Sequence, residues 1–329
     1  ENDEYFLRLE VQDDLFGTTA FEASVGVRGD FKLGNFRLSF SDLTIPVAGI
    51  PITLARNYDT LRSDRDSDMG FGWRLEFRNA DLRTSLTKTG LEDLGIYRGF
   101  KPGTKVYLTL PGGRREGFTF TPDLRAPPGF GGNLVIATPR FTPDRGVRDT
   151  LSVQGGTFIV NESGELVSGG GQPWNPAALE FAGAYTLTTP EGLVYKIDGN
   201  TGLLTSATDR NGNVLAFSES GITGQGVNVA FERDARGRIT RAIDPAGNSV
   251  RYAYDSRGDL ATVTDREGNV TQFVYRTDRA HYLDTVIDPL GRTGVRVEYD
   301  ADGRLNGTTN AMGHTINTCL LYTSDAADE

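Results

Sequence analysis

Cysteine and histidine are almost absent from this sequence of 329 residues, which has one Cys, Cys319, and two His. A single thiol cannot form a disulfide within the chain, so a disulfide-stapled fold is excluded. No run of 18 apolar residues occurs, so no membrane-spanning helix is predicted. Acidic residues outnumber basic ones and give a net charge of −10, which argues against a nucleic-acid-binding face.

Glycine is abundant, with 41 residues, and many of these glycines belong to one repeated phrase. From about residue 195 to residue 316 a β-prone run is followed by Asp-x-x-Gly and another β-prone run. The turns recur every ten to twelve residues from Asp234 to Asp265 and from Asp288 to Asp300, and a degenerate unit fills the gap of 23 residues between Asp265 and Asp288. Asp favours the first position of a type I turn, Pro the second and Gly the fourth. The predicted turn residues are Asp209, Gly212, Asp234, Gly237, Asp244, Pro245, Gly247, Asp255, Gly258, Asp265, Gly268, Asp288, Pro289, Gly291, Asp300 and Gly303, with Asn310-Ala-Met-Gly313 as a variant.

The residues between these turns alternate between apolar and polar. In Val295-Arg-Val-Glu-Tyr299 the apolar side chains fall on one face of a strand and the charged ones on the other. Residues 250–254 and 227–231 follow the same pattern. A single hairpin is marginally stable, so repeated hairpins must stack on their neighbours. We therefore predict an all-β fold of repeated antiparallel hairpins that form a long curling sheet.

Two regions carry a resemblance to a known family. The pairs Tyr254-Asp255 and Tyr299-Asp300, each followed by x-x-Gly, look like the YD repeats of the Rhs family. Upstream, Arg56-Asn-Tyr58 and Gly70-Phe-Gly72-Trp73 resemble the segment that leads into such repeats in bacterial proteins. Together these regions cover roughly residues 31–80 and 190–316.

The resemblance implies the beginning of an Rhs-type β-cocoon, a non-catalytic wall that encloses a C-terminal toxin or effector domain. It implies no cofactor, and it implies downstream repeats and an encapsulated domain of the same chain as partners. It places the protein outside the cell or at the cell surface. Rhs cores that release their cargo carry a self-cleaving aspartyl site, but Asp288-Pro-Leu-Gly291 is a repeat turn, so no cleavage residue is assigned.

Two other functions remain open at this stage. The first is a cell-surface adhesion or carbohydrate-binding module, which would require exposed aromatic side chains. The second is an enzyme, which would require polar side chains that converge in a pocket, and the sequence reveals no such set.

We predict five segments along the chain. Residues 1–30 would be the end of a preceding β region or a cap, residues 31–84 the lead-in segment, and residues 85–185 a Gly- and Pro-rich β insertion. Residues 186–318 would be the array of YD-repeat hairpins. Residues 319–329 resemble the translation of a sequencing adapter, so we expect the native sequence to end near Thr318.

A few residues could carry chemistry beyond turns. Asp64, Asp66 and Asp68 alternate as in a calcium loop, but the Gly and Glu that such a loop needs each come one residue late. We therefore assign no metal and keep these three as candidates, with an acidic hairpin loop as the alternative. His281 and His314 lack a nearby nucleophile motif and are predicted to be surface residues.

The recurring aromatic side chains have two readings. Those at strand positions of the repeats, among them Tyr252, Phe273 and Tyr275, fit a buried face better than a sugar-binding platform. Trp174 lies between two prolines and is predicted to be an exposed loop residue, which makes it the better ligand candidate.

Overall fold

The computed structural model describes residues 4–12, 18–26, 34–46, 49–110, 114–127, 134–224 and 226–317. The predicted adapter tail, residues 319–329, lies outside the described residues. The chain divides into two compact units. Unit 1 comprises residues 1–28, 48–50 and 78–218, and unit 2 comprises residues 29–47, 51–77 and 219–329.

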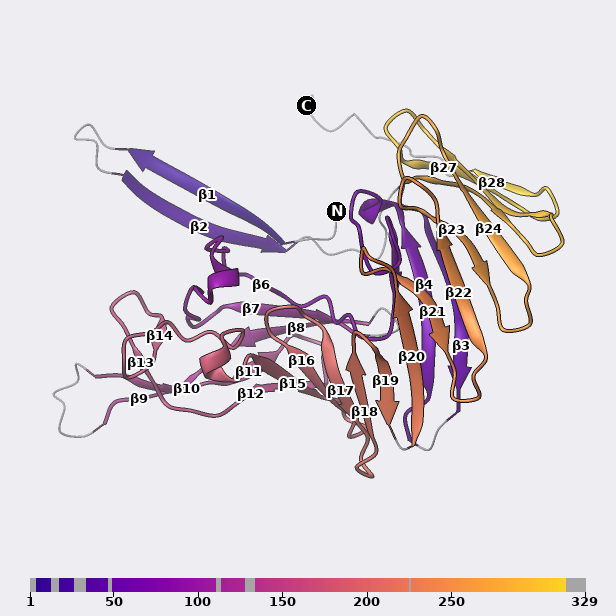
Figure 1. Cartoon of the computed structure of the whole chain (residues 1–329). Coiled ribbons are helices and arrows are strands. Elements are labelled where there is room, and N and C mark those ends of the chain that lie inside the picture. Colours follow the sequence, from indigo (N-terminus) through magenta and orange to yellow (C-terminus); the bar gives the residue numbers. More distant parts are fainter. Residues whose placement is uncertain are drawn as a thin grey trace. The chain divides into compact units, whose positions relative to one another are not determined.

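Unit 1 is built almost entirely from short strands (Figure 1). Its strands are β1 (Glu4–Gln12), β2 (Thr18–Gly26), β6 (Arg83–Thr84), β7 (Lys105–Thr109), β8 (Arg115–Phe120), β9 (Asp123–Arg125), β10 (Ile136–Thr138), β11 (Phe141–Pro143), β12 (Thr150–Val153), β13 (Phe158–Val160), β14 (Leu166–Val167), β15 (Ala184–Thr188), β16 (Val194–Asp198), β17 (Leu204–Thr208) and β18 (Val214–Ser218). They pair in the orders β1-β2, β14-β13-β10-β9, β11-β8-β7-β6 and β12-β15-β16-β17-β18. Two single-turn 3₁₀ helices, η2 (Glu92–Leu94) and η3 (Leu179–Phe181), connect them.

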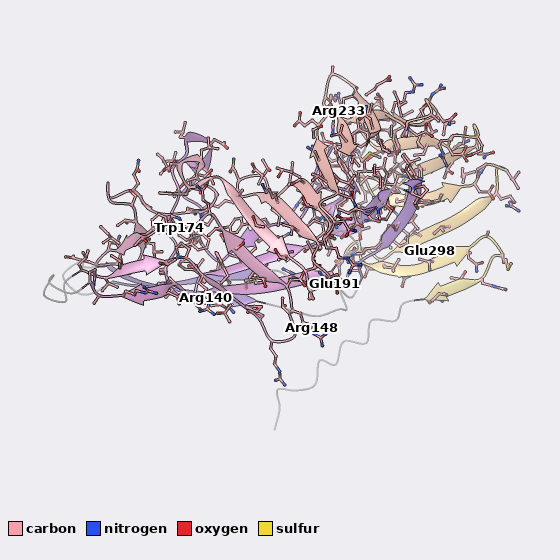
Figure 2. The ribbon with its side chains drawn as sticks, turned by 90° about the horizontal axis from the view of Figure 1, so that it is seen from below. Arg140, Arg148, Trp174, Glu191, Arg233 and Glu298 are labelled. Atoms are coloured by element: carbon pink, nitrogen blue, oxygen red, sulfur yellow. The ribbon has the colours of Figure 1, made fainter. Side chains whose placement is uncertain are left out.

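The core of unit 1 is aromatic. The Trp174 ring stacks on Phe120 with centroids 5.3 Å apart and meets Phe100 edge-on at 5.5 Å. Trp174 is only 1% exposed (labelled in Figure 2), so its prediction as an exposed ligand candidate is wrong. The flanking prolines predict a loop, but a loop that runs along the hydrophobic core can still bury a large side chain such as that of Trp174. The backbone N–H of Trp174 donates to the carbonyl of Leu166, which holds it there.

Unit 2 contains two sheets (Figure 1). The lead-in segment supplies a three-stranded sheet of β3 (Arg37–Ile45), β4 (Ile52–Asp59) and β5 (Trp73–Leu75), with the 3₁₀ helix η1 (Thr60–Arg62) after β4. Ten further strands pair in chain order: β19 (Gly221–Gly224), β20 (Val227–Arg233), β21 (Ile239–Ile243), β22 (Ser249–Tyr254), β23 (Leu260–Thr264), β24 (Val270–Tyr275), β25 (Leu283–Ile287), β26 (Thr293–Tyr299), β27 (Leu305–Asn310) and β28 (Thr315–Asn317). The fold is thus all-β with antiparallel hairpins in one long array, as predicted, and the described residues contain no helix other than the three 3₁₀ turns.

The turns of the array share one hydrogen-bond pattern. In the Asp234 turn the N–H of Gly237 donates to the carbonyl of Asp234 at 3.0 Å, and Gly237 has φ +82. The Asp234 carboxylate accepts the N–H groups of Arg236 and Arg238 at 2.9 and 3.0 Å. The same contacts recur in the turns that begin at Asp209, Asp244, Asp255, Asp265, Asp288 and Asp300, and in the Asn310 turn.

The carboxylates of these turns also receive side-chain donors. The amide of Asn213 lowers the pKa of Asp209, and the guanidinium of Arg292 lowers the pKa of Asp288. These donors favour the ionised form, and that form is the one that accepts backbone N–H groups. The turns are therefore closed by charge-assisted bonds at neutral pH.

Candidate functional site

The lead-in segment lies against the apolar face of the repeat sheet. Hydrogen bonds and aromatic contacts join the two. The buried face of the sheet is formed by one residue set: Val229, Phe231, Ile239, Ala242, Val250, Tyr252, Leu260, Val263, Phe273, Tyr275, Leu283, Val286 and Val297. Figure 1 shows β3 and β4 beside β20 to β22. Tyr252, Phe273 and Tyr275 are therefore core residues, as their alternation predicts.

A ladder of hydroxyl bonds runs across the repeats. The strand pairs shift register at a β-bulge before Tyr254, Tyr275 and Tyr299, and each of these hydroxyls then donates to a carbonyl of the preceding strand. The bonds join Tyr254 to Ile239, Tyr275 to Leu260 and Tyr299 to Leu283, at 2.6, 2.8 and 3.0 Å. The bulge re-aims the side chain so that it can bridge its own hairpin.

Arg233 takes the tyrosine position in the first hairpin of this series (labelled in Figure 2). It also follows a bulge, and its Nε donates to the carbonyl of Glu219 at 2.9 Å. A guanidinium thus makes the same kind of contact with an upstream carbonyl that the hydroxyls make in later repeats. This contact explains why Arg233-Asp234 can replace the Tyr-Asp pair of other repeats.

Trp73 connects the lead-in segment to this ladder. Its indole Nε1–H donates to the Tyr275 hydroxyl at 2.8 Å, while its ring packs against Tyr58 and Phe273 with centroids 5.4 and 5.0 Å apart. Trp73 is 1% exposed. The Tyr275 hydroxyl therefore both accepts from the lead-in segment and donates to the sheet, and its position is fixed from both sides.

Tyr58, which pairs with Trp73 across β4 and β5, makes a second connection to the repeat sheet. Its hydroxyl donates to the carbonyl of His281 at 2.7 Å and accepts the N–H of Leu283 at 2.9 Å. These two bonds hold the chain where it enters β25. Burial raises the pKa of Tyr58 above its usual range, so the hydroxyl keeps its proton at any physiological pH.

A buried ion pair involves Arg56, which lies two residues before Tyr58 on β4. Arg56 Nε is 2.8 and 2.9 Å from the two carboxylate oxygens of Asp42, and the two side chains are only 3% and 4% exposed. The Tyr252 hydroxyl also donates to Asp42, at 2.9 Å. The guanidinium lies 4.3 Å from the ring centre of Phe40 and close to two further rings, in a cation–π arrangement. We call Asp42, Arg56, Tyr58 and Trp73, with their partners on the sheet, the aromatic seat.

The predicted calcium candidates occupy the loop between η1 and β5. The Asp66 carboxylate accepts the N–H of Ser67, and the Asp68 carboxylate lies 3.7 Å from a guanidinium nitrogen of Arg233. The Asp68 carbonyl accepts the N–H of Ile239 at 2.7 Å, so this loop also contacts the repeats. Over the described residues, no group of three His, Cys, Asp or Glu side chains is placed to hold a metal ion.

His281 is not a surface residue, contrary to the sequence-based prediction. Its side chain is 19% exposed, its ring stacks on Phe71 with centroids 3.8 Å apart, and its Nδ1 is 2.7 Å from the Asp259 carboxylate. Within the described part of the chain, no Ser, Thr or Cys side chain bonds to this imidazole, so the pair lacks the nucleophile of a catalytic triad. The irregular sequence around His281 hid its burial, because no alternation is visible there.

Residues 233–270 match the RHS Repeat family, and residues 30–86 match a domain of unknown function, DUF6531. The chain therefore contains an Rhs repeat. The matched repeat begins at the bulge residue Arg233, and the second match covers the lead-in segment with the aromatic seat. No curated protein matches the Rhs-repeat chain.

Two solved structures are similar to it. "Crystal Structure of TcdB2-TccC3-TEV" is 13% identical with a TM-score of 0.19, and the match covers 78% of this chain and 18% of that one. "Crystal Structure of TcdB2-TccC3-Cdc42" is 14% identical with a TM-score of 0.21, and the match covers 82% and 14%. The Rhs-repeat chain thus spans less than a fifth of the length of each.

Sequence reasoning missed a buried carboxylate pair in unit 1 of the Rhs-repeat chain. Arg114 lies 3.1 Å from Glu116 and 2.6 Å from Asp149, and both acids are almost fully buried. Burial, reinforced by the negative charge of Asp149, raises the pKa of Glu116 to about 7. No motif marks these residues, since the partners are 33 positions apart (149 − 116).

Glu116 makes the stability of the protein depend on pH. Its pKa in the folded state lies above the ordinary value of 4.5, so the folded state binds the proton more tightly and stability falls as pH rises from about 4.5 to 7. We expect the free energy of unfolding of Glu116→Gln, measured with urea, to equal that of the wild type at pH 5. At pH 8 it should exceed the wild-type value by roughly 1–3 kcal/mol. The exposed Glu180→Gln variant is the control and should follow the wild type at both pH values. If the free energy of unfolding changed by the same amount between pH 5 and pH 8 in Glu116→Gln and in the wild type, this assignment would be wrong.

Proposed function

We propose that this chain is a non-catalytic stretch of wall in an Rhs-type shell that encloses a C-terminal toxin or effector domain of the same polypeptide. Its ten strands β19 to β28 pair in chain order, so the sheet can extend by adding hairpins at β28 without rearranging what precedes it. The Rhs repeat supports the family, and enclosure is the function we infer from it.

The observation that carries the proposal is the character of the exposed side chains. Among the residues whose side chains the structure describes, 34–46, 49–110, 114–127, 134–224 and 226–317, the large exposed apolar residues are Leu, Ile, Val and Met, and none is aromatic. A carbohydrate-binding surface stacks exposed rings on sugar faces, whereas here the rings are turned into the aromatic seat and the core of unit 1. This distribution of rings favours the wall over the adhesion alternative for the side chains that the structure describes from residue 34 onward.

The second face of the repeat sheet carries charged side chains on three neighbouring strands, and the exposed Val270 and Val274 lie on β24. Glu232, Arg241 and Arg251 lie opposite one another on three neighbouring strands, and Arg241 forms an ion pair with Glu232 at 3.2 Å. A wall with a polar face can surround another polypeptide without binding its apolar segments. The described residues contain no helix that is long and apolar enough to cross a membrane. We place the intact protein outside the cell or at its surface, with the downstream repeats and the enclosed domain as its partners.

The test uses the natural polypeptide in full. The source gene is read across the codon of Thr318, and the encoded protein is expressed and digested with trypsin. We expect further Asp-x-x-Gly turns, then a separate C-terminal domain that resists trypsin in the intact protein and is cut quickly when expressed alone. Equal rates of cutting in the two settings would overturn enclosure. A frame that leads into a wall or membrane anchor, together with carbohydrate binding, would establish the adhesion module instead.

A further inference from the structure

Each repeat hairpin of unit 2 meets the lead-in segment beside its β-bulge. Across each bulge, one residue of the second strand stands opposite the residue that re-aims its side chain, and these second-strand residues are Ile239, Leu260, Leu283 and Leu305. A bulge interrupts the ladder of hydrogen bonds between two strands, so backbone groups beside it need partners from elsewhere. The lead-in segment supplies such partners.

Two of these partners come from β4 and the loop that follows it. The N–H of Ile239, in the first hairpin (β20–β21), donates to the carbonyl of Asp68 at 2.7 Å. The N–H of Leu283, in the third hairpin (β24–β25), donates to the Tyr58 hydroxyl at 2.9 Å. Both bonds leave the repeat sheet, so each ties one hairpin to one fixed point of the lead-in segment.

Glycine lets the other two hairpins come close. In the fourth hairpin (β26–β27) the N–H of Leu305 donates to the carbonyl of Gly34 at 2.8 Å, and a Cβ at Gly34 would lie 2.6 Å from the Cβ of Arg304. In the second hairpin (β22–β23) a Cβ at Gly70 would lie 2.5 Å from the carbonyl oxygen of Gly258. Both lead-in glycines have φ +83, which residues with a side chain rarely adopt. The lead-in segment therefore touches four consecutive hairpins.

The contacts differ from one hairpin to the next, although the hairpins share one phrase. The first hairpin meets a loop carbonyl, the second a glycine and the Asp42 carboxylate, the third a hydroxyl and the Trp73 indole, and the fourth the carbonyl of a glycine. Each hairpin thus has its own place on the lead-in segment, set by contacts of a different kind.

The third hairpin shows how one place differs from another. The His281 ring stacks on Phe71 with centroids 3.8 Å apart, and the His281 carbonyl accepts the Tyr58 hydroxyl at 2.7 Å. The fourth hairpin instead turns through the regular phrase, residues 300–303, which contains no aromatic ring. The fourth hairpin would therefore lose the ring contact if it took the place of the third.

Repetition makes the register of such an array ambiguous. In the structure Thr262 of β23 stands opposite Gln272 of β24, three residues before Tyr275. Arg296 holds the same position in β26, three residues before Tyr299. If β23 paired with β26, the third hairpin would be looped out, and a loop costs only slightly more entropy as it lengthens. Strands with a repeated alternation can slip in this way, and misassembly is a characteristic failure of repeat proteins.

We propose that the lead-in segment is the register template of the repeat array. It holds four consecutive hairpins at four different places, and so it determines which strand pairs with which. A hairpin in the wrong place forfeits contacts with the template, whereas its contacts with neighbouring hairpins are those of any other repeat. This gives a role to the domain of unknown function that residues 30–86 match.

Disulfides that form during refolding report the register. One parent chain carries Thr262→Cys and Gln272→Cys, which are opposite in the native register, and another carries Thr262→Cys and Arg296→Cys, which are opposite only when the third hairpin is skipped. In the native sheet β24 and β25 separate the second pair, so their Cα atoms are roughly 14 Å or more apart, too far for a disulfide. Both chains carry Cys319→Ser and are refolded from urea in a glutathione buffer.

We expect the parent chains to form the native disulfide and almost none of the skipped one. Tyr58→Phe with Phe71→Ala removes the hydroxyl and ring contacts of the third hairpin. It should raise the skipped disulfide roughly tenfold, the order of magnitude expected when such hydrogen bonds are lost. Tyr299→Phe is the matched control, because it removes a hydroxyl bond between two hairpins and leaves the template intact. Its level of the skipped disulfide should equal that of the parent.

An unchanged level of the skipped disulfide in the double variant, with the native disulfide still formed, would overturn the template. An equal rise in Tyr299→Phe would also overturn it, because a general loss of stability would then explain the slip. Tyr58→Phe alone is refolded in parallel, and if the double variant forms neither disulfide, this milder variant decides by the same two comparisons. Because these readouts come from the chain alone, they do not depend on whether a cargo is enclosed.

Discussion

Replacing Asp42 with Asn is expected to lower the free energy of unfolding of unit 2 by about 3–5 kcal/mol, because it leaves Arg56 as a buried charge without a counter-ion. The guanidinium is 3% exposed, and its Nη1 already has no hydrogen-bond partner. The surrounding rings of Phe40, Trp73 and Phe273 offset only part of that charge. Urea unfolding followed by tryptophan fluorescence would measure the loss, since Trp73 lies in the same cluster.

Two further variants separate the buried charge from other effects. Arg37→Gln removes an ion pair with Asp59 whose arginine is 62% exposed, and it should cost less than about 1 kcal/mol. The double variant Asp42→Leu, Arg56→Met removes both charges and should recover most of the loss, since an apolar pair can replace a buried ion pair. If the double variant were as unstable as Asp42→Asn, the loss would come from the Tyr252 bond or from packing instead of charge.

Trp73→Ala is expected to cost about 3–5 kcal/mol, the range for deleting a large buried ring. Trp73→Phe keeps much of the ring volume but loses the Nε1–H bond to Tyr275, and it should cost roughly 1–2 kcal/mol. The same unfolding measurement applies, with fluorescence replaced by circular dichroism because the probe itself is changed. Leu290→Ala, at a residue 74% exposed, is the control and should fall within about 0.5 kcal/mol of the wild type. Equal losses in Trp73→Phe and Trp73→Ala would show that the hydrogen bond, and not the ring, connects the two sheets.

The repeat array could be predicted from sequence because its information is local. The Asp and Gly of a turn lie three positions apart, and each strand alternates within five to seven residues, so 295–299 was identified as the strand that the structure shows as β26. The buried face of the array followed from the same alternation. The division into five segments stays a prediction. The contacts of the lead-in segment with the repeats, which place both in one unit, do not follow from local sequence.

The contacts of the aromatic seat could not be predicted in this way. Asp42 and Tyr252 are 210 positions apart, and Tyr58 and Leu283 are 225 apart. A periodic pattern indicates that a side chain faces inward, but it does not indicate which distant strand will cover it. Asp259 did leave a signal, as the one acid that follows the Gly of a repeat turn, but its meaning appears only once His281 is placed beside it.

The contacts of the aromatic seat join residues that are far apart in sequence, so the ribosome makes the two partners of each contact at different times. Tyr58 and Trp73 are made first, yet the partners that bury them, Leu283 and Tyr275, follow 225 and 202 residues later. At typical translation rates of about 5–20 residues per second, the lead-in segment waits roughly 10–45 s for its cover. Each repeat hairpin, by contrast, can close its own hydroxyl bond as soon as about 15 further residues have emerged. The array therefore assembles hairpin by hairpin, and a newborn chain exposes the rings of the lead-in segment to chaperones, or to other nascent chains, until the β25 hairpin arrives to cover them.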